Sequence, residues 1–96
     1  MIEYKRRIAN AETYIWGGTK VAAPLNAQLV LLLHNDDAGE EIMFGQHKKQ
    51  DGKLDLGLLE PGATYAVALD GLIGVYARCT TDKADSFVRC VVIVNK

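Results

Sequence analysis

Two cysteines and two histidines are the residues of this sequence with the clearest chemical potential. A thiol paired with an imidazole can act as a nucleophile, so Cys79 or Cys90 beside His34 or His47 would suit a cysteine enzyme. Nothing in the local sequence favours an activated thiolate, and a cysteine on a β-strand is usually a small apolar core residue. We therefore predict no enzyme. The Cys–His alternative requires a thiol within hydrogen-bond reach of an imidazole and rapid alkylation at neutral pH.

The same four side chains are also the candidate metal ligands. Structural zinc sites use closely spaced cysteine pairs, and the sequence contains none. If residues 27–34 and 41–46 form a hairpin, His34 and His47 lie at its opposite ends, roughly 20 Å apart. The acidic turn at residues 36–41 matches no EF-hand spacing, and no glycine-rich phosphate-binding motif is present. We therefore expect no metal and no cofactor.

Turn residues recur along the whole chain, and short β-prone segments lie between them. Gly17-Gly18, Asp51-Gly52, Pro61-Gly62 and Asp70-Gly71 are typical of tight turns. The strands are expected at residues 4–8, 13–16, 20–23, 27–34, 41–46, 64–69, 74–80 and 87–94. This pattern predicts an all-β fold: a single small antiparallel β-sandwich of about seven or eight strands with hairpin or Greek-key connections. A small barrel is the second choice.

A hairpin between residues 74–80 and 87–94 would place the two cysteines opposite each other. Directly opposed residues lie about 4.5–5.5 Å apart, which would allow a disulfide between Cys79 and Cys90. A cytoplasmic product would stay reduced, so we favour two free thiols and keep the disulfide as the alternative.

Length and charge limit the remaining function classes. The 96 residues predict one domain, 1–96, with residues 1–10 as a candidate N-terminal arm that contacts a partner. A net charge of -1 gives no field to attract nucleic acid or an anionic membrane. The N-terminus lacks the apolar stretch of a secretory signal, and no apolar run is long enough to span a bilayer. We expect synthesis in a cytoplasm, without nucleic-acid or membrane partners.

Two expected strands are apolar on both faces. In residues 28–34, Leu29, Leu31 and Leu33 alternate with Val30 and Leu32. The last strand likewise ends apolar on both sides, with Val91 and Ile93 on one of them. A sandwich strand needs only one apolar face, so something should cover the second face. The cover is either the N-terminal segment folded back or another protein, and the latter predicts an oligomer or a stable complex.

Two further surface groups are candidate partner contacts. Tyr14 and Trp16 beside the Gly17-Gly18 turn could form an aromatic patch, although Trp16 could instead close one end of the core. The basic cluster Lys5-Arg6-Arg7 is short and has acidic neighbours, which favours a solvated surface or ion pairs to a partner protein. The candidate partner-contact residues are therefore Tyr14, Trp16, Val30, Leu32, Val91, Ile93, Lys5, Arg6 and Arg7.

The order of these features resembles a family of small bacteriophage virion proteins. The matching segments are Arg7-Ile8-Ala9-Asn10-Ala11, residues 29–35, Ile42-Met43-Phe44-Gly45, Leu59-Glu60-Pro61-Gly62, Tyr65, Gly74-Val75-Tyr76-Ala77 and residues 88–94. The two cysteines and the charged residues 46–53 depart from the family pattern. The resemblance implies a non-enzymatic structural protein of a phage head or tail, such as a capsid cement, decoration or minor structural subunit. It would assemble in the host cytoplasm and contact the major capsid protein, neighbouring subunits or further copies of itself.

The main alternative is a free binding module that recognises carbohydrate or a host protein through Tyr14 and Trp16. An exposed Trp16 with aromatic neighbours would favour that module. A buried Trp16 together with apolar patches on the outer face would favour assembly. An inhibitor of a host enzyme also remains open.

Overall fold

Eight β-strands make up the regular structure of the described chain. The computed structural model describes residues 2–17 and 28–95, and these ranges contain no helix. The strands are β1 (Ile2–Ile8), β2 (Thr13–Gly17), β3 (Gln28–Asn35), β4 (Ile42–Lys48), β5 (Gly52–Leu59), β6 (Thr64–Ala68), β7 (Leu72–Cys79) and β8 (Ser86–Asn95). The all-β prediction is confirmed. The strand expected at residues 20–23 lies outside the described residues, and β5 was not predicted.

The predicted glycine turns have the backbone conformations that they require. Gly52, Gly62 and Gly71 adopt φ angles of 76°, 83° and 76°. Side chains with a Cβ atom rarely adopt these angles, which is why glycine follows Asp51, Pro61 and Asp70 at the turns.

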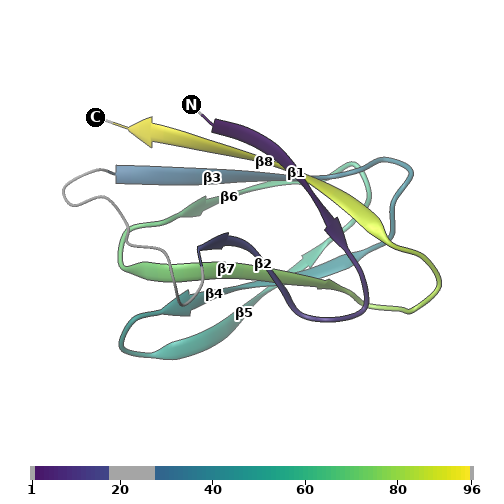
Figure 1. Ribbon diagram of the computed structural model, residues 1–96, viewed down its shortest axis with the longest axis horizontal. Coiled ribbons are helices and arrows are strands. Elements are labelled where there is room, and N and C mark those ends of the chain that lie inside the picture. Colours follow the sequence, from purple (N-terminus) through teal and green to yellow (C-terminus); the bar gives the residue numbers. More distant parts are fainter. Residues whose placement is uncertain (1, 18–27, 96) are drawn as a thin grey trace.

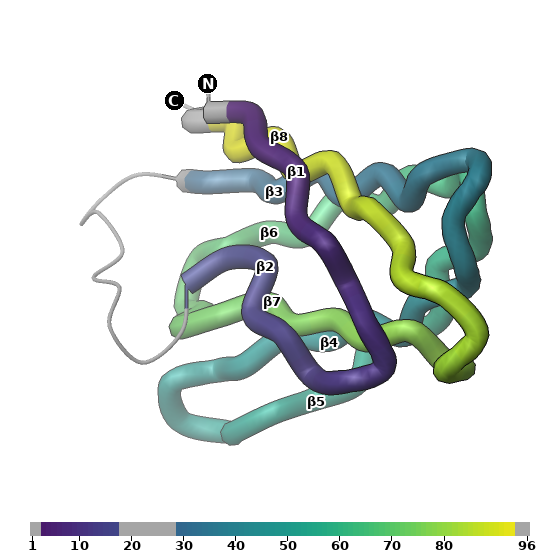
Figure 2. The backbone as a smooth tube through the Cα atoms, turned by 45° about the vertical axis from the view of Figure 1, so that its right-hand side comes forward, coloured from purple at the N-terminus to yellow at the C-terminus, as the bar shows by residue number. Residues whose placement is uncertain are grey.

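The strands form two four-stranded antiparallel sheets that face each other. Sheet A has the order β1-β8-β3-β6 and sheet B has the order β2-β7-β4-β5 (Figure 1). Among the described strands, only β4 and β5 follow each other within one sheet, and every other connection crosses to the opposite sheet. Figure 2 shows these crossings in the backbone trace. Eight strands wound in this order form a jelly-roll β-sandwich, with Greek-key connections.

The crossings contradict the two hairpins expected from the sequence. The segments containing His34 and His47 belong to β3 and β4, which lie in different sheets. Cys79 on β7 and Cys90 on β8 are likewise in different sheets, and both are free and buried. The turns at Asp51-Gly52, Pro61-Gly62 and Asp70-Gly71 were identified correctly, whereas Gly17 belongs to β2 and Gly18 lies outside the described residues. Turn residues do not determine whether the next strand returns to the same sheet.

The core lies between the sheets and is filled by alternate residues of each strand. On sheet A, β3 contributes Leu29, Leu31 and Leu33, and the neighbouring strand β8 contributes Val88, Cys90 and Val92. Sheet B contributes, among others, Ile15, Ile42, Phe44 and Val75. In these strands every second residue therefore faces the core, and the residues between them face outward.

A buried polar contact closes one end of the sandwich. The Asn35 amide donates to the carbonyls of Glu40 at 2.7 Å and Leu59 at 2.9 Å. Ser86 donates its hydroxyl to Asn35 Oδ1 at 2.5 Å, and both side chains are fully buried. Asn35 therefore joins the ends of β3, β5 and β8 to the β3–β4 loop.

Candidate functional site

Six apolar side chains form a continuous block on the outer face of sheet A. The β3–β8 register places Val30 opposite Ile93 and Leu32 opposite Val91. The β3–β6 register adds Ala68 beside Val30 and Ala66 beside Leu32. We call Val30, Leu32, Ala66, Ala68, Val91 and Ile93 the apolar block. Its four larger members are partly exposed and its two alanines are exposed.

No described strand lies over the apolar block. Residues 2–8, which could have folded back over it, form β1 and pair with β8 at the edge of the same sheet. All eight described strands belong to the two sheets, and sheet B covers the inner face. The apolar character predicted for both faces of β3 and β8 is therefore directed outward as well as inward. Contact with a partner at these residues remains a prediction.

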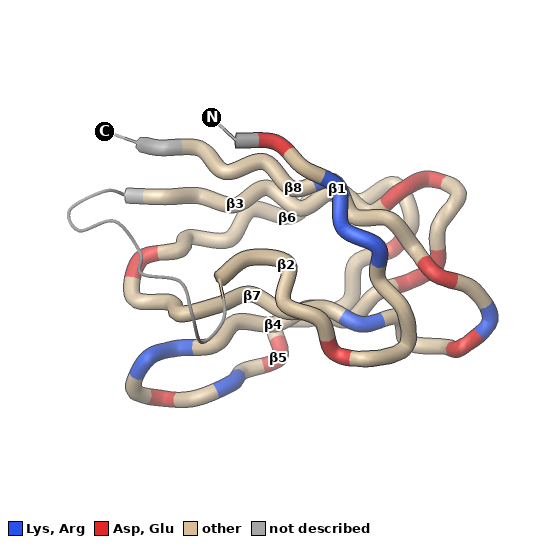
Figure 3. Tube along the Cα trace, in the orientation of Figure 1, with Lys and Arg blue, Asp and Glu red and all other residues tan. Residues whose placement is uncertain are grey.

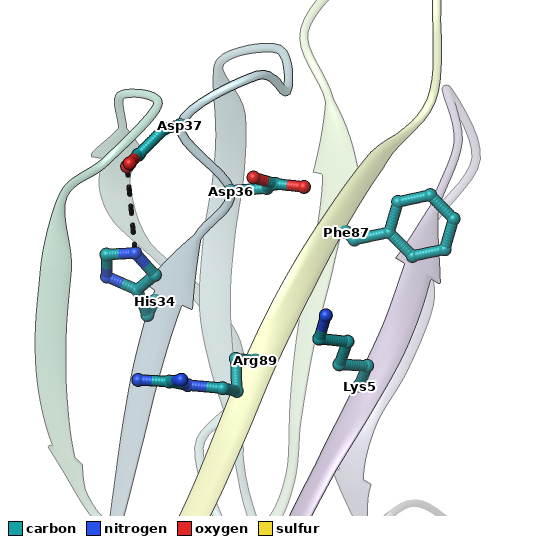
Figure 4. A pocket seen from close by; sticks show the side chains of 6 residues that line it. All are labelled: Lys5, His34, Asp36, Asp37, Phe87 and Arg89. Atoms are coloured by element: carbon teal, nitrogen blue, oxygen red, sulfur yellow. Dashed lines mark ion pairs between the residues drawn. The ribbon is translucent and has the colours of Figure 1, made fainter.

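A small charged pocket of about 200 Å³ lies on the same sheet. Its lining residues are Lys5, His34, Asp36, Asp37, Phe87 and Arg89 (Figure 4). Cross-strand pairing places Lys5 opposite Arg89 and Arg89 opposite His34. The His34–Arg89 pair lies two residues along β3 and β8 from the Leu32–Val91 pair, on the same face of the sheet. The pocket therefore borders the apolar block.

The pocket contains both signs of charge, so it does not form a purely cationic surface. His34 Nε2 lies 3.8 Å from Asp37 Oδ1, and His34 Nδ1 lies 2.8 Å from Thr64 Oγ1. Arg89 Nε lies 3.6 Å from Glu3 Oε1. Figure 3 shows the same mixture along β1 and the loops at this end. Exposed pairs of this kind are individually weak, but they can orient a protein partner.

The three consecutive basic residues of β1 do not act as one cluster. Lys5 lines the pocket, whereas Arg7 forms an ion pair with Asp85 in the β7–β8 loop. Arg6 alternates to the other side of the strand, opposite Val88 in the register. The candidate residues Lys5, Arg6 and Arg7 are therefore distributed over two sides of an edge strand.

Tyr14 and Trp16, for which an aromatic patch and a core role of Trp16 were both open, make different contacts. A register irregularity between them lets Trp16 pair with Val75 and pack, partly buried, against the core. Tyr14 instead contacts His47 on β4, with its hydroxyl 2.8 Å from His47 Nδ1. Trp16 follows the alternative in which it closes part of the core.

Tyr14 belongs to an aromatic and charged network on sheet B. Lys53 Nζ lies 5.5 Å from the ring centroids of both Tyr14 and Tyr76 and forms an ion pair with Glu12. Tyr76 donates its hydroxyl to Asp55 at 2.6 Å, and burial raises the pKa of that phenol. The aromatic faces are occupied by the chain's own lysine, which makes this network a stabilising contact between β2, β4, β5 and β7. His47, Lys53 and Tyr76 were not predicted as members of this network.

The cysteines and histidines lie in different parts of the sandwich. Cys79 donates to the carbonyl of Ile8 at 3.1 Å and Cys90 to that of Val88 at 3.7 Å, both in the core. His34 and His47 contact Thr64 and Tyr14 near the surface. Within residues 2–17 and 28–95, no three His, Cys, Asp or Glu side chains are grouped so that they could hold a metal ion. None of the described segments is a helix that could cross a membrane.

Stability is expected to fall as the pH rises above about 9. Burial raises the pKa of Cys90 from 9.0 to about 11 and that of Tyr4 from 10.0 to about 12. Between these values the folded chain keeps protons that the unfolded chain loses, so the free energy of unfolding decreases with pH. Urea unfolding in a series from about pH 8 to about pH 11 measures the decrease. Burial also raises the pKa of the Cys79 thiol, so Cys90→Ala should make the decrease that begins near pH 9 smaller without abolishing it. An unchanged slope in that variant would contradict the assignment to Cys90.

Comparisons of the chain with protein-family models, with curated proteins and with solved structures each find no significant match.

Proposed function

We propose that this chain is a non-enzymatic structural subunit of a virion, of the capsid cement, decoration or minor-subunit kind. In this role it packs against neighbouring virion proteins through the outer face of sheet A. The observation that carries the proposal is the apolar block. Its six residues come from three neighbouring strands, four from β3 and β8 and two from β6. Isolated apolar residues are common on surfaces, but a continuous block beside a charged rim is typical of a protein interface.

The energetics favour a partner that covers this face. Complete burial of a Val or Leu side chain contributes about 1.5–3 kcal/mol, and each of the four larger members still has part of that burial to gain. A 96-residue domain has a modest stability of its own, which binding to a lattice of partners increases by mass action. The charged pocket beside the block supplies the polar rim that fixes orientation.

The jelly-roll strand order is compatible with the proposed virion role but does not distinguish it from other functions. This architecture is used by viral capsid domains, and also by lectins and cupins. The fold therefore agrees with a virion subunit, while the argument for assembly depends on the apolar block and its charged rim.

The free binding module has less support than assembly. It was expected to present Tyr14 and Trp16 together, whereas Trp16 packs against the core and Tyr14 contacts His47. A Cys–His enzyme requires the two residue types side by side, whereas Cys79 and Cys90 make their hydrogen bonds to core carbonyls.

The test is whether the chain is a stoichiometric component of particles. Phage particles purified by density gradient from the cells that produce this chain are analysed by quantitative mass spectrometry. We expect many copies per particle for the natural chain, and loss of the chain from particles for the double variant Leu32→Lys, Val91→Lys. Leu58→Lys on β5 adds the same charge at a residue that is 58% exposed on sheet B, and it should leave incorporation unchanged. Particles without the chain, or a double variant that incorporates normally, would overturn the proposal.

A further inference from the structure

The edges of the two sheets differ in how they are protected from pairing with another strand. An edge strand exposes unpaired backbone groups, and proteins usually protect such edges with charges or bulges. Charged side chains run along β1, and β2 contains the register irregularity between Tyr14 and Trp16. A register shift also disturbs β5, which carries Lys53 and Asp55. Strand β6 has neither protection: its residues are Thr64-Tyr65-Ala66-Val67-Ala68.

The backbone hydrogen bonds between β3 and β6 show which residues of β6 point their backbone groups away from β3. The backbone N–H of Asn35 donates to the carbonyl of Ala63 at 3.0 Å, and the backbone N–H of Leu69 donates to the carbonyl of Leu29 at 2.8 Å. In an antiparallel ladder, alternate residues point both backbone groups to the same side. Residues 63, 65, 67 and 69 therefore bond toward β3, and Thr64, Ala66 and Ala68 point their N–H and C=O groups outward. No backbone hydrogen bond within the described ranges joins these three residues to another strand.

We propose that two copies of this chain pair through β6, antiparallel and in register about a two-fold axis at Ala66. Ala66 then faces the partner's Ala66, and Thr64 faces the partner's Ala68 in both directions. The outward backbone groups of all three residues are satisfied, two bonds at each facing pair. The result is one continuous eight-stranded sheet made from the two copies of four-stranded sheet A (Figure 1).

The side chains of β6 suit a second copy in particular. A residue on a two-fold axis meets itself, so a charged residue there repels its own copy. Ala66 has no charge, whereas the corresponding central residue of the β1 edge is Lys5. On the inner side, the pairing places Tyr65 opposite the partner's Val67, and aromatic–β-branched cross-strand pairs are favourable. Tyr65 is 44% exposed in the single chain although it packs on Phe44 at 4.8 Å between ring centroids.

Exposed apolar residues are concentrated on this side of the sandwich. The Tyr4 hydroxyl of β1 donates to the backbone carbonyl of Ile15 on β2, and the ring of Phe44 on β4 contacts that of Tyr65 on β6 in a tilted arrangement. Strand β6 therefore lies over the β4–β5 side of sheet B. Of the four large exposed hydrophobic residues in the described ranges, Leu54 and Leu58 are on β5 and Tyr65 is on β6. The pairing also brings the two apolar blocks into one face, because Ala66 and Ala68 belong to the block. It does not depend on the proposed virion role.

A charge-swap experiment at Ala66 tests the pairing. Sedimentation equilibrium of the purified chain should show a reversible dimer of the 10.5 kDa chain. Ala66→Lys and Ala66→Glu each place like charges face to face on the axis and should raise the dimer dissociation constant at least about tenfold. An equal mixture of the two variants places Lys opposite Glu and should restore the dimer. Lys5→Glu on the β1 edge is the matched control and should leave the dimer unchanged.

Each other outcome overturns the proposal. A natural chain that stays monomeric at its highest soluble concentration excludes the dimer. A dimer that persists in both Ala66 variants places the contact elsewhere. Two monomeric variants that fail to pair when mixed, although circular dichroism shows both to be folded, exclude the two-fold register at Ala66. None of these results depends on particle incorporation, so this proposal and the proposed function can fail separately.

Discussion

Asn35→Ala is expected to lower the free energy of unfolding by about 3 kcal/mol. The substitution removes both donors to the Glu40 and Leu59 carbonyls and the acceptor of the Ser86 hydroxyl. Because Asn35 and Ser86 are fully buried, the carbonyls of Glu40 and Leu59 and the Ser86 hydroxyl would lose these hydrogen bonds with little access to water. Urea unfolding followed by tryptophan fluorescence measures the loss, since Trp16 packs against the core.

Asn10→Ala is the matched control for this prediction. The Asn10 amide also donates to a backbone carbonyl, that of Cys79 at 2.7 Å, but Asn10 is exposed and water can replace the bond. Its expected cost is about 1 kcal/mol or less. Equal losses for the two variants would show that the Asn35 contact has no special role at the end of the sandwich.

The strand pattern could be predicted from the sequence because turn residues and β-branched residues act locally. Asp51-Gly52, Pro61-Gly62 and Asp70-Gly71 each mark a real turn with positive φ. Strand pairing is a long-range property, and for this reason the two expected hairpins were wrong. A polar connection such as residues 80–85 suits a hairpin as well as a crossing between sheets.

Strand β5 was missed because its pattern is weak. Lys53-Leu54-Asp55-Leu56 alternates, but it follows the charged residues 46–53, and Gly57 breaks the alternation, so in sequence the segment resembles a charged loop. The position of Trp16 against the core depends on the register irregularity between Tyr14 and Trp16, and no single residue of the sequence indicates that irregularity. The Asn35–Ser86 contact joins residues 51 positions apart, and the sequence signal for it was only a polar residue at the end of an apolar strand.

The apolar block was the part of the site that could be predicted, since it breaks the period-two pattern of a sandwich strand. Val30, Leu32, Val91 and Ile93 were identified as outward residues of their strands, and the register now places them side by side. Ala66 and Ala68 were missed, because small residues give no signal without knowledge of which strand lies next to β3.

Adjacent residues of β3 are expected to respond in opposite ways to the same substitution. Leu31→Lys places an ammonium group at a fully buried core position, and the cost of several kcal/mol is comparable to the whole stability of a small domain. We therefore expect an unfolded chain, with loss of the β-sheet circular dichroism signal. Leu32→Lys directs the same group outward into the apolar block, where we expect a change in unfolding free energy of about 1 kcal/mol or less.

The comparison separates a structural role of the outer face from a binding role. If Leu32 served only the fold, its lysine variant would lose stability in proportion to its burial and would bind partners normally once folded. If the face is an interface, Leu32→Lys stays folded and loses incorporation into particles, because an unpaired charge must then be buried against the partner. Unfolding of Leu32→Lys to the same extent as Leu31→Lys would show that the apolar block is covered within the single chain, and it would remove the main support for assembly through sheet A.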